Sequence, residues 1–358
     1  MSNFGGVFRG RRVLLTGHTG FKGSWLALWL QQLGAEIFAM SLPSETHPNH
    51  FGLLQLDLTE YITDIRDYPS VNKVITSVNP EVVFHLAAQP LVRRSYADPL
   101  ATWSTNVLGT ANVLEACRHT SSVNAIVAVT TDKCYENQEW LWGYRENDRL
   151  GGHDPYSASK AGAELVASSY RKSYFYDQDA PLLATARAGN VIGGGDWSED
   201  RLIPDLVRAS VRKESVEIRS PNSTRPWQHV LESLSGYLLL GQKLLEGHTN
   251  FADAWNFGPD ETGNQTVGVV LSKLSEKWEG LRWHLTPEIQ PHEASLLHLD
   301  STKARTLLDW HPVWGLEEGL THTADWYRTF LDKGEVISRQ QLANYLAKAE
   351  KENIGWAK

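Results

Sequence analysis

The chain has 358 residues, of which 41% are hydrophobic and 21% charged, and it contains 28 Gly but only 2 Cys. This composition excludes disordered and collagen-like chains, and two cysteines are too few for a disulfide framework or a cysteine zinc site. The net charge of −8, without a basic block, argues against nucleic acid or a membrane surface as the partner. No apolar run approaches the roughly 20 residues of a membrane span, and no signal core precedes the first arginines, so we expect a cytoplasmic protein.

The first half of the chain alternates short apolar runs with longer amphipathic segments. The predicted strands are 12–16, 36–40, 61–64, 82–86, 125–130 and 182–187. The predicted helices are 23–33, 68–78, 100–118 and 156–173. This alternation predicts an α/β fold, a Rossmann-type doubly wound parallel sheet with helices on both faces.

The chain after about residue 188 is less regular and predicts loops and short helices, among them 266–278 and 302–308, with an amphipathic helix in 336–358. We expect residues 1–190 to form the sheet domain with the catalytic residues. Residues 191–358 are then mainly a smaller C-terminal substrate-binding lobe, with some strands or helices returning to the first domain. Such a lobe would close over the carboxyl edge of the sheet, where open α/β sheets bind ligands.

A glycine-rich turn follows the first predicted strand, where residues 16–23 read TGHTGFKG and precede a helix. Three glycines spaced by three permit a tight turn, close approach of a pyrophosphate and a helix N-terminus that favours an anion. An ordinary turn is the alternative, and a Walker loop is excluded because no GK[ST] follows. We predict a dinucleotide site that includes Gly17, His18, Gly20, Phe21, Lys22 and Gly23, with His18 facing the pyrophosphate or solvent.

The ends of the next strands indicate which dinucleotide binds. The second strand ends at Ser41 and Leu42, where there is neither a carboxylate for a ribose hydroxyl nor an arginine for a 2′-phosphate, and this favours NAD weakly over NADP. Asp64 and Ile65 at the third strand's end are expected to bracket the adenine. At the fourth strand's end, the segment Leu86, Ala87, Ala88 and Gln89 offers small alanine side chains that permit close approach of the cofactor.

Tyr156 and Lys160 lie four residues apart, on one face of a helix that Pro155 can start. A phenol is a poor base at neutral pH, but a neighbouring ammonium stabilises the phenolate and lowers its pKa. The pair could therefore take a proton from a sugar hydroxyl while hydride leaves to nicotinamide. A solvated helix face is the alternative for any such spacing.

The fifth predicted strand ends in Thr131, Asp132 and Lys133, at the edge where the Tyr156 helix should also begin. A hydroxyl, a carboxylate and an amine in a row can offer a hydrogen-bond donor, a general acid and a general base to one substrate. A turn with a surface ion pair is the alternative.

From the glycine turn to about Arg305 the chain resembles the extended short-chain dehydrogenase/reductases, and within them the sugar-nucleotide 4,6-dehydratases. The glycine turn and the Tyr–Lys spacing are general, whereas the motifs at 130–137 and 151–160 are much more specific. The matching segments are TGHTGFKG (16–23), HLAAQ (85–89), NVLGT (106–110), TTDKCYEN (130–137), YRENDRLGGHDPYSASK (144–160), RAGNVIGGGDW (187–197), RLIPDL (201–206) and RPWQHV (225–230).

The resemblance implies a lyase that holds NAD tightly and makes a 4-keto-6-deoxy sugar with no net redox change. Tyr156, supported by Lys160 and Thr131, would take the 4-hydroxyl proton as hydride leaves C4. Asp132 would protonate the departing 6-hydroxyl while a base removes H5, and the hydride would return to C6. Asn106 is implied to contact the cofactor. The implied substrate is a CDP-hexose, CDP-D-glucose; the alternatives are a GDP-, dTDP- or UDP-sugar, or 4-epimerisation.

One position departs from many relatives, which have Glu directly after the Asp where this chain has Lys133. A lysine can serve as the C5 base only if burial or a neighbouring cation keeps it partly neutral. The alternatives are that Lys133 orients Asp132, or that Glu136 is the base.

A net-acidic protein needs placed arginines to bind a nucleotide diphosphate, because guanidinium groups match phosphate oxygens bidentately. The resemblance places Asn190 and Arg225 at the diphosphate and several other residues around the nucleobase, ribose and pocket rim. These substrate residues are Arg201, Leu202, Pro204, Arg219, Asn256, His292 and Glu293.

We expect no metal site, since the histidine pairs lack the helical spacing of zinc motifs. The resemblance also implies a homodimer or dimer of dimers, formed by a four-helix bundle of 100–118 and 156–173 from two subunits. A non-catalytic NAD-sensing relative is a different class; there the Tyr or Lys would be missing, and both are present.

Overall fold

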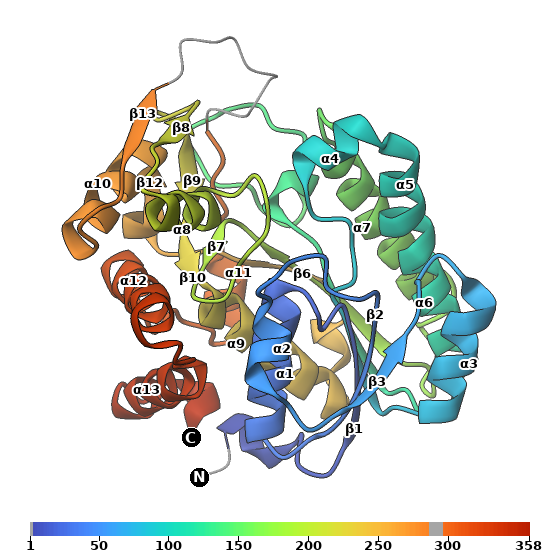
Figure 1. Ribbon diagram of the computed structural model, residues 1–358. Helices are drawn as coiled ribbons and strands as arrows, with labels where there is room; N and C mark the ends of the chain where they lie inside the picture. Colours follow the sequence, from blue (N-terminus) through green and yellow to red (C-terminus); the bar gives the residue numbers. More distant parts are fainter. Residues whose placement is uncertain (1–2, 286–295) are drawn as a thin grey trace.

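The computed structural model describes residues 3–285 and 296–358. Its centre is a seven-stranded sheet with the order β11-β6-β5-β4-β1-β2-β3, and every neighbouring pair of strands is parallel (Figure 1). The strand order reverses between β1 and β4, which opens a crevice at their carboxyl ends. The strands are β1 (Arg12–Thr16), β2 (Glu36–Ser41), β3 (Thr59–Ile62), β4 (Val82–His85), β5 (Ala125–Val129), β6 (Leu182–Ala188) and β11 (Ala254–Phe257).

Helices cover both faces of this sheet because the inner strands are apolar on both sides. On one face, α3 (Tyr68–Val78), α6 (Gly109–Arg118) and α7 (Pro155–Ser173) pack over Leu14, Val83 and Ile126. The other face carries α1 (Phe21–Gln32) and α9 (Val230–Leu245), both rich in buried Leu. The predicted doubly wound α/β fold is confirmed.

Most predicted elements of the first half are present, with two main differences. Strand β3 lies two residues earlier than predicted. The predicted helix 100–118 is three segments, α5 (Pro99–Trp103), a π-helical turn η2 (Ser104–Leu108) and α6. In the second half, the helix predicted in 336–358 is present as α13 (Ser338–Lys351), but the expectation of short helices before it was wrong: α9 has 16 residues and α12 (Leu316–Lys333) has 18, and β11 was not predicted.

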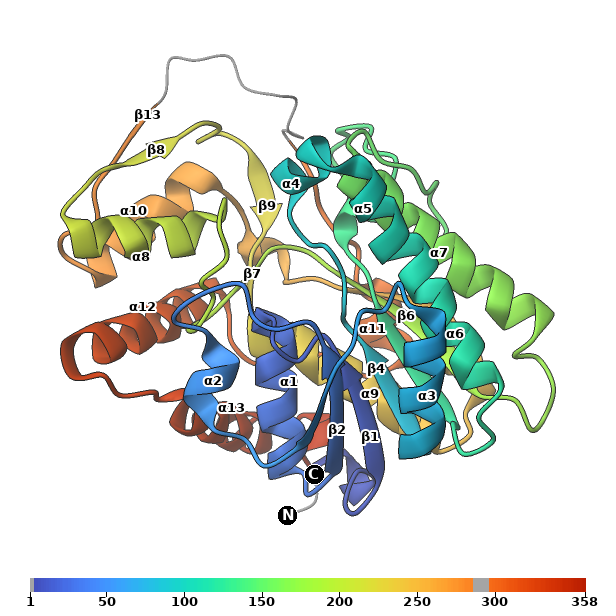
Figure 2. The same ribbon diagram turned by 45° about the vertical axis from the view of Figure 1, so that its right-hand side comes forward.

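A smaller lobe lies over the carboxyl edge of the sheet (Figure 2). It contains three two-stranded sheets, which pair β7 with β10, β9 with β12 and β8 with β13. Its elements are β7 (Val191–Ile192), α8 (Leu202–Arg212), β8 (Val216–Ile218), β9 (Thr224–Pro226), β10 (Gln228–His229), β12 (Asn264–Thr266), α10 (Val267–Lys277), β13 (Trp283–Leu285) and α12. Strand β11 and helix α9 return to the sheet, and the division at residue 190 stays a prediction.

The two ends of the described chain lie close together (Figure 1). The ring of Phe4 stacks on that of Trp356 with 5.0 Å between centroids.

Buried Glu232 on α9 fixes the segment that precedes α12, because it accepts hydrogen bonds from the backbone N–H groups of Val313 and Trp314 at 2.9 and 2.8 Å. The remaining elements are η1 (Asn3–Gly6), α2 (His50–Leu54), α4 (Val92–Ala97), η3 (Asp132–Cys134), η4 (Thr249–Phe251), η5 (Glu261–Gly263), α11 (Thr302–Leu307), α13 (Ser338–Lys351) and η6 (Gly355–Ala357).

Candidate active site

One continuous cleft of about 1370 Å³ runs between the carboxyl edge of the sheet and the smaller lobe. Its walls come from the glycine turn, the ends of β2 to β5, the start of α7 and the segments around α8 and β9. A drug-sized ligand site has about 300–1,000 Å³. The cleft therefore has room for two nucleotide ligands side by side.

The glycine turn fits a dinucleotide pyrophosphate. Gly17 has φ +79°, and a Cβ there would lie 2.7 Å from the backbone nitrogen of Ala87. A Cβ on Gly23 would lie 2.1 Å from the carbonyl oxygen of Gly17. Gly20 caps α1 without a side-chain hydrogen bond, so the helix N-terminus is open toward the cleft and favours an anion.

The variant Gly23→Ala should destabilise the protein by about 1–3 kcal/mol and weaken NAD binding, because the added methyl forces the turn away from α1. Thermal unfolding with and without NAD measures both effects. Gly315→Ala is the matched control, since a Cβ at that helix N-cap meets nothing within 4 Å. An NAD affinity equal to that of the wild type would contradict the proposed role of this turn.

The expectation that His18 faces the pyrophosphate or solvent is wrong for its side chain. The ring is fully buried, and its Nε2 lies 2.7 Å from the Oε2 of Glu60 on β3. Burial lowers the pKa of His18, and the Glu60 carboxylate counteracts this. The ring joins the glycine turn to β3, and the cleft is lined by the residues on either side of it.

The Asn106 side chain also points away from the cleft. Its Oδ1 accepts the backbone N–H of Gln89 at 2.8 Å, and its Nδ2 donates to the Gln89 carbonyl and to Ser159 of α7. The residue lies in the π-helical turn η2, a feature often found near functional sites. Asn106 thus holds the cleft-lining segment Leu86–Gln89, rather than reaching a cofactor itself.

The adenine end predicted at Asp64 and Ile65 is part of the cleft, as are Leu86, Ala87, Ala88 and Gln89. At the end of β2, the Thr19 hydroxyl lies 2.8 Å from the Ser41 hydroxyl, with no carboxylate at that position. Two arginines that the sequence interpretation had not placed here line the same region. Arg66 forms an ion pair with Asp64 and Arg94 with Glu45, so each guanidinium is already paired with a carboxylate.

The helix α7 begins at Pro155, as predicted, and presents Tyr156 and Lys160 to the cleft. Asp154 caps it by accepting the Ser157 N–H at 2.9 Å. Burial raises the pKa of Tyr156 to about 12, while a hydrogen bond with Thr131 acts in the opposite direction. The positive charge of Arg201 also acts against this rise, and the lowering of the Tyr156 pKa by Lys160 stays a prediction.

Lys160 is buried and donates to the Val129 carbonyl at 3.3 Å. Burial lowers its pKa to about 8, and the negative charge of Glu164 counteracts this. The ammonium therefore stands between the end of β5 and the phenol-bearing turn of α7.

The short helix η3 places Asp132 and Lys133 directly after β5, beside Tyr156 in the cleft. Thr131 donates a hydrogen bond to the Oδ1 of Asp132 at 2.9 Å. The Oδ2 of Asp132 is buried without a hydrogen-bond partner among the described residues. Gly189 leaves space for it, since a Cβ there would approach Oδ2 to 3.0 Å. A buried carboxylate oxygen of this kind is suited to a substrate hydroxyl.

Sequence reasoning missed where the Lys22 side chain goes. Its Nζ donates to the hydroxyl of Tyr237 on α9 at 3.2 Å, within electrostatic reach of Asp132. Burial, together with the charges of Arg201 and Lys160, lowers the pKa of Lys22 to about 7. A third amine, besides those of Lys133 and Lys160, therefore lies in the catalytic part of the cleft. The sequence offered no signal for this, because α9 is more than 200 residues away along the chain.

Most predicted substrate residues line the lobe side of the cleft. Arg201 pairs with Asp196 at 2.9 Å and acts on the Tyr156 phenol, so it lies closer to the catalytic residues than expected. The pairing of β7 with β10 brings the segment after Asn190 beside that after Arg225. The predicted residues on the cleft wall are Asn190, Arg201, Leu202, Pro204, Arg219 and Arg225.

The Asn256 prediction is wrong, and two others lie outside the described residues. Asn256 on β11 is fully buried and accepts a hydrogen bond from the Tyr135 hydroxyl at 2.7 Å, away from the cleft wall. His292 and Glu293 fall in the segment that the structure does not describe. Within residues 3–285 and 296–358 no cluster of three metal-ligating side chains is present. None of the helices in these ranges is long and apolar enough to cross a membrane.

A doubly wound parallel sheet, a glycine turn after β1 and a Tyr–Lys pair on α7 together define a short-chain dehydrogenase/reductase of the extended type. The family model described as GDP-mannose 4,6 dehydratase matches residues 14–323, and the chain belongs to this family. Among curated relatives, the CDP-glucose 4,6-dehydratase of Salmonella typhimurium is 48% identical over 350 residues, covering 95% of this chain and 97% of the relative.

Solved structures show the same fold. A UDP-glucose 4-epimerase of Thermus thermophilus in complex with NAD has a TM-score of 0.77 and 26% identity, covering 88% of this chain and 99% of the other. A dTDP-glucose 4,6-dehydratase of Streptomyces venezuelae, with NAD bound, has a TM-score of 0.74 and 25% identity, covering 88% and 97%. Both reactions in these names act at C4 of a nucleotide sugar, which is the chemistry that a Tyr–Lys pair suits.

Proposed function

We propose that the protein is an NAD-dependent lyase that converts CDP-D-glucose to CDP-4-keto-6-deoxyglucose and water. The observation that carries this proposal is the convergence of Tyr156 with Asp132 and Lys133 in one cleft. A group for C4 chemistry and an acid–base pair for loss of water therefore face the same space. The identity of 48% with a CDP-glucose 4,6-dehydratase supports the nucleotide assignment.

The cofactor would lie along the glycine turn, with its adenine toward Asp64 and its nicotinamide toward Tyr156. Gly17, Gly20 and the start of α1 would hold the pyrophosphate. When bound, NAD supplies a reversible hydride acceptor. The arginines of the lobe, among them Arg225, would neutralise the substrate diphosphate.

The protein's own side chains would move the protons. Tyr156 accepts the proton of the 4-hydroxyl, and the resulting ketone makes the C5 proton acidic. Lys133 takes that proton while Asp132 donates one to the departing 6-hydroxyl, so one water leaves. Lys133 then returns a proton to C5, while the hydride taken from C4 would go back to C6, so that the cofactor ends in its starting oxidation state. Thr131 holds Asp132 by its hydrogen bond to Oδ1, and the unpartnered Oδ2 would be available to the substrate.

A substrate panel tests the proposed function. The protein is incubated with NAD and with CDP-, dTDP-, GDP- or UDP-glucose, and mass spectrometry measures loss of one water from each. We expect water loss from CDP-glucose at the highest kcat/KM. Higher kcat/KM with another nucleotide would correct the specificity, and loss from none, with NAD binding verified, would overturn the dehydratase.

The role of Lys133 as the C5 base has its own test. Lys133→Met should leave NAD binding intact and stop exchange of the C5 hydrogen with solvent deuterium, because the variant lacks the amine that would remove this hydrogen. Glu136 is a weaker alternative, since its carboxylate pairs with Arg149 at 2.7 Å. Unaltered exchange in Lys133→Met, together with its loss in Lys22→Met, would assign the base to Lys22 instead.

A 4-epimerase is the second candidate, because it needs the same Tyr–Lys pair and relatives at 26% and 28% identity carry that name. Epimerisation needs no acid and base for water loss. The unpartnered Oδ2 of Asp132 favours the dehydratase. The substrate panel separates the two, since an epimerase changes no mass.

The proposed homodimer, or dimer of dimers, would use the outer face of α5, η2 and α7. This face exposes large apolar side chains, of which Leu100 is 80% and Leu165 60% exposed, with Trp103 beside them. Exposed apolar patches on adjacent helices are typical of protein interfaces. Sedimentation at micromolar concentration should give a dimer, and Leu100→Glu with Leu165→Glu should give a monomer. A monomeric wild type would contradict this assembly.

The proposed product is a precursor of deoxysugars for surface polysaccharide such as O-antigen. A relative from Haloferax volcanii, 28% identical over 88% of this chain and 98% of its own length, is described as a glycan biosynthesis protein. The proposed compartment is the cytoplasm, and the buried free thiols of Cys117 and Cys134 fit a reducing environment.

A further inference from the structure

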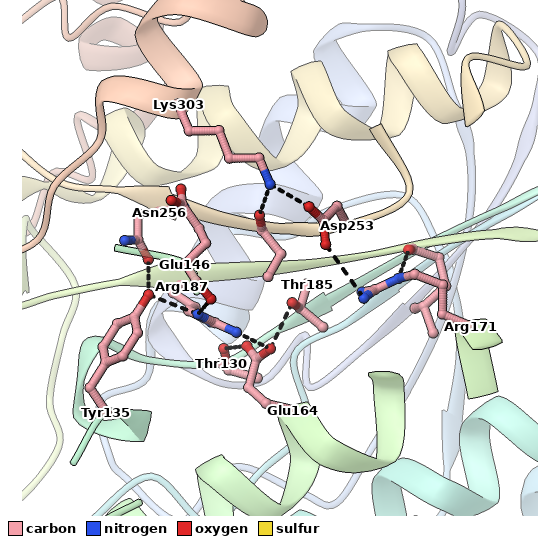
Figure 3. Close-up of polar contacts among 12 residues, drawn as sticks. Thr130, Tyr135, Glu146, Glu164, Arg171, Thr185, Arg187, Asp253, Asn256 and Lys303 are labelled. Carbon is pink, nitrogen blue, oxygen red and sulfur yellow. Dashed lines mark hydrogen bonds and ion pairs between the residues drawn. The ribbon is translucent and has the colours of Figure 1, made fainter. Parts of the chain in front are cut away.

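A buried ion pair lies behind the loop that carries the proposed acid and base. Glu164 on α7 and Arg187 on β6 are each 3% exposed, and their Oε2 and Nη2 atoms lie 2.7 Å apart (Figure 3). A pair of this kind often adds little stability compared with apolar residues of similar volume, because both charges lose their hydration. Its retention in a core therefore calls for another explanation.

Glu164 is hydrogen-bonded to the residue that precedes segment 131–134, the loop that carries Asp132 and Lys133. Thr130, which directly precedes Thr131, donates to the Oε1 of Glu164 at 2.5 Å. Thr185 on β6 donates to the other oxygen at 2.8 Å. Both carboxylate oxygens thus accept hydrogen bonds, which join the end of β5 to α7 and β6.

Arg187 is hydrogen-bonded to the residue that follows the same segment, 131–134. Its Nη1 donates to the hydroxyl of Tyr135 at 2.7 Å, and Tyr135 directly follows the loop. The same Nη1 donates to the Glu146 carbonyl at 3.0 Å, and the Tyr135 hydroxyl in turn donates to Asn256 (Figure 3). One ion pair therefore holds the residues immediately before and after segment 131–134.

The pair also belongs to the helix that bears the Tyr–Lys pair. Glu164 lies four residues after Lys160, so both side chains are on the same face of α7. A shift of Glu164 would therefore move the loop and the helix relative to each other. Such a shift of about 1 Å can cost a catalytic group about a hundredfold in rate.

We propose that the Glu164–Arg187 pair is a positioning element that fixes the acid–base loop, Asp132 and Lys133, against the Tyr156 helix. The inference rests on the proposed function for the reaction it serves. Glu164 and Arg187 do not themselves line the cleft, whereas their partners Thr130 and Tyr135 do, so the pair acts on the cleft through these two residues.

The test compares Glu164→Gln with the double variant Glu164→Gln/Arg187→Met. The single variant leaves a buried charge unpaired and should lower the melting temperature, and the double variant should regain most of it. In both variants we expect faster hydrogen–deuterium exchange in the peptide around 130–136. We also expect kcat to fall at least about tenfold with KM within about twofold, since the substrate's binding groups are untouched.

Glu232→Gln is the matched control: it also alters a fully buried carboxylate, the new NH₂ faces N–H donors, and its hydrogen bonds are with Val313, Trp314 and Tyr345. It should lower the melting temperature without changing exchange around 130–136 or kcat. If the single variant does not fold, Thr130→Val removes the hydrogen bond to Glu164 and Tyr135→Phe removes the one from Arg187, without leaving an unpaired charge buried. The proposal would be overturned if backbone exchange around 130–136 and kcat recovered in the Glu164→Gln/Arg187→Met variant. It would also be overturned if both stayed at wild-type values in Glu164→Gln, or in Thr130→Val and Tyr135→Phe. A wild type that loses no water from any nucleotide sugar would contradict only the proposed function, because the exchange comparison needs no substrate.

Discussion

Replacing Tyr156 with Phe is expected to lower kcat by about a hundredfold to ten-thousandfold, the range that one positioned proton acceptor contributes. The ring is buried and stays in place, so the variant should fold and bind NAD like the wild type. Because the 4-hydroxyl keeps its proton, no reduced nicotinamide should form in a single turnover. Exchange of the C5 hydrogen should also be absent, since no ketone is made.

Tyr170→Phe is the matched control for that variant. Tyr170 lies on the same helix, and its hydroxyl donates to Glu115 at 3.0 Å, outside the cleft. Removing it should leave kcat within about twofold of the wild type. A Tyr156→Phe enzyme with wild-type kcat would place the proton acceptor elsewhere, and Lys22 would be the first residue to examine.

Replacing Asp132 with Asn should lower the rate of water loss by a similar hundredfold to ten-thousandfold, at a different stage. The amide has nearly the same shape but cannot protonate the departing 6-hydroxyl. Oxidation at C4 should still occur, so the absorbance of reduced nicotinamide should rise and persist. Lys133 remains, and the C5 hydrogen should therefore still exchange with solvent.

The two variants thus give opposite signals in the same assay. Tyr156→Phe should stop before oxidation, and Asp132→Asn should stop after it. If Asp132→Asn also failed to reduce the cofactor, Asp132 would be needed for the first step. The assignment of Asp132 as the acid for water loss would then be wrong.

The parts of the fold that follow from local sequence could be predicted. The strand, glycine turn and helix at the N-terminus are consecutive, and the start of α7 is marked by Asp154 and Pro155. Loop 131–134 was correctly placed at the cleft because parallel strands end at one edge of a sheet. By contrast, β11 pairs with β6 across about 70 residues of chain, and nothing in its short sequence indicates that partner.

The wrong site predictions share one cause, since the direction of a side chain depends on residues far away in sequence. His18 points to Glu60 because β3 lies behind the glycine turn. Asn256 lies near the end of a strand, but its side-chain amide is hydrogen-bonded to the Tyr135 hydroxyl and to backbone carbonyls. Lys22 reaches the catalytic residues because α9 supplies Tyr237 as its partner. Motifs located these residues on elements, and packing decided which way each one points.

The central claim is that one cleft carries out oxidation, water loss and reduction on a single sugar. The most direct test uses CDP-glucose with deuterium at C4. The account predicts a product lighter by one water that carries the deuterium at C6, with solvent hydrogen at C5. Deuterium lost to solvent, or a product of unchanged mass with the label still at C4, would contradict it.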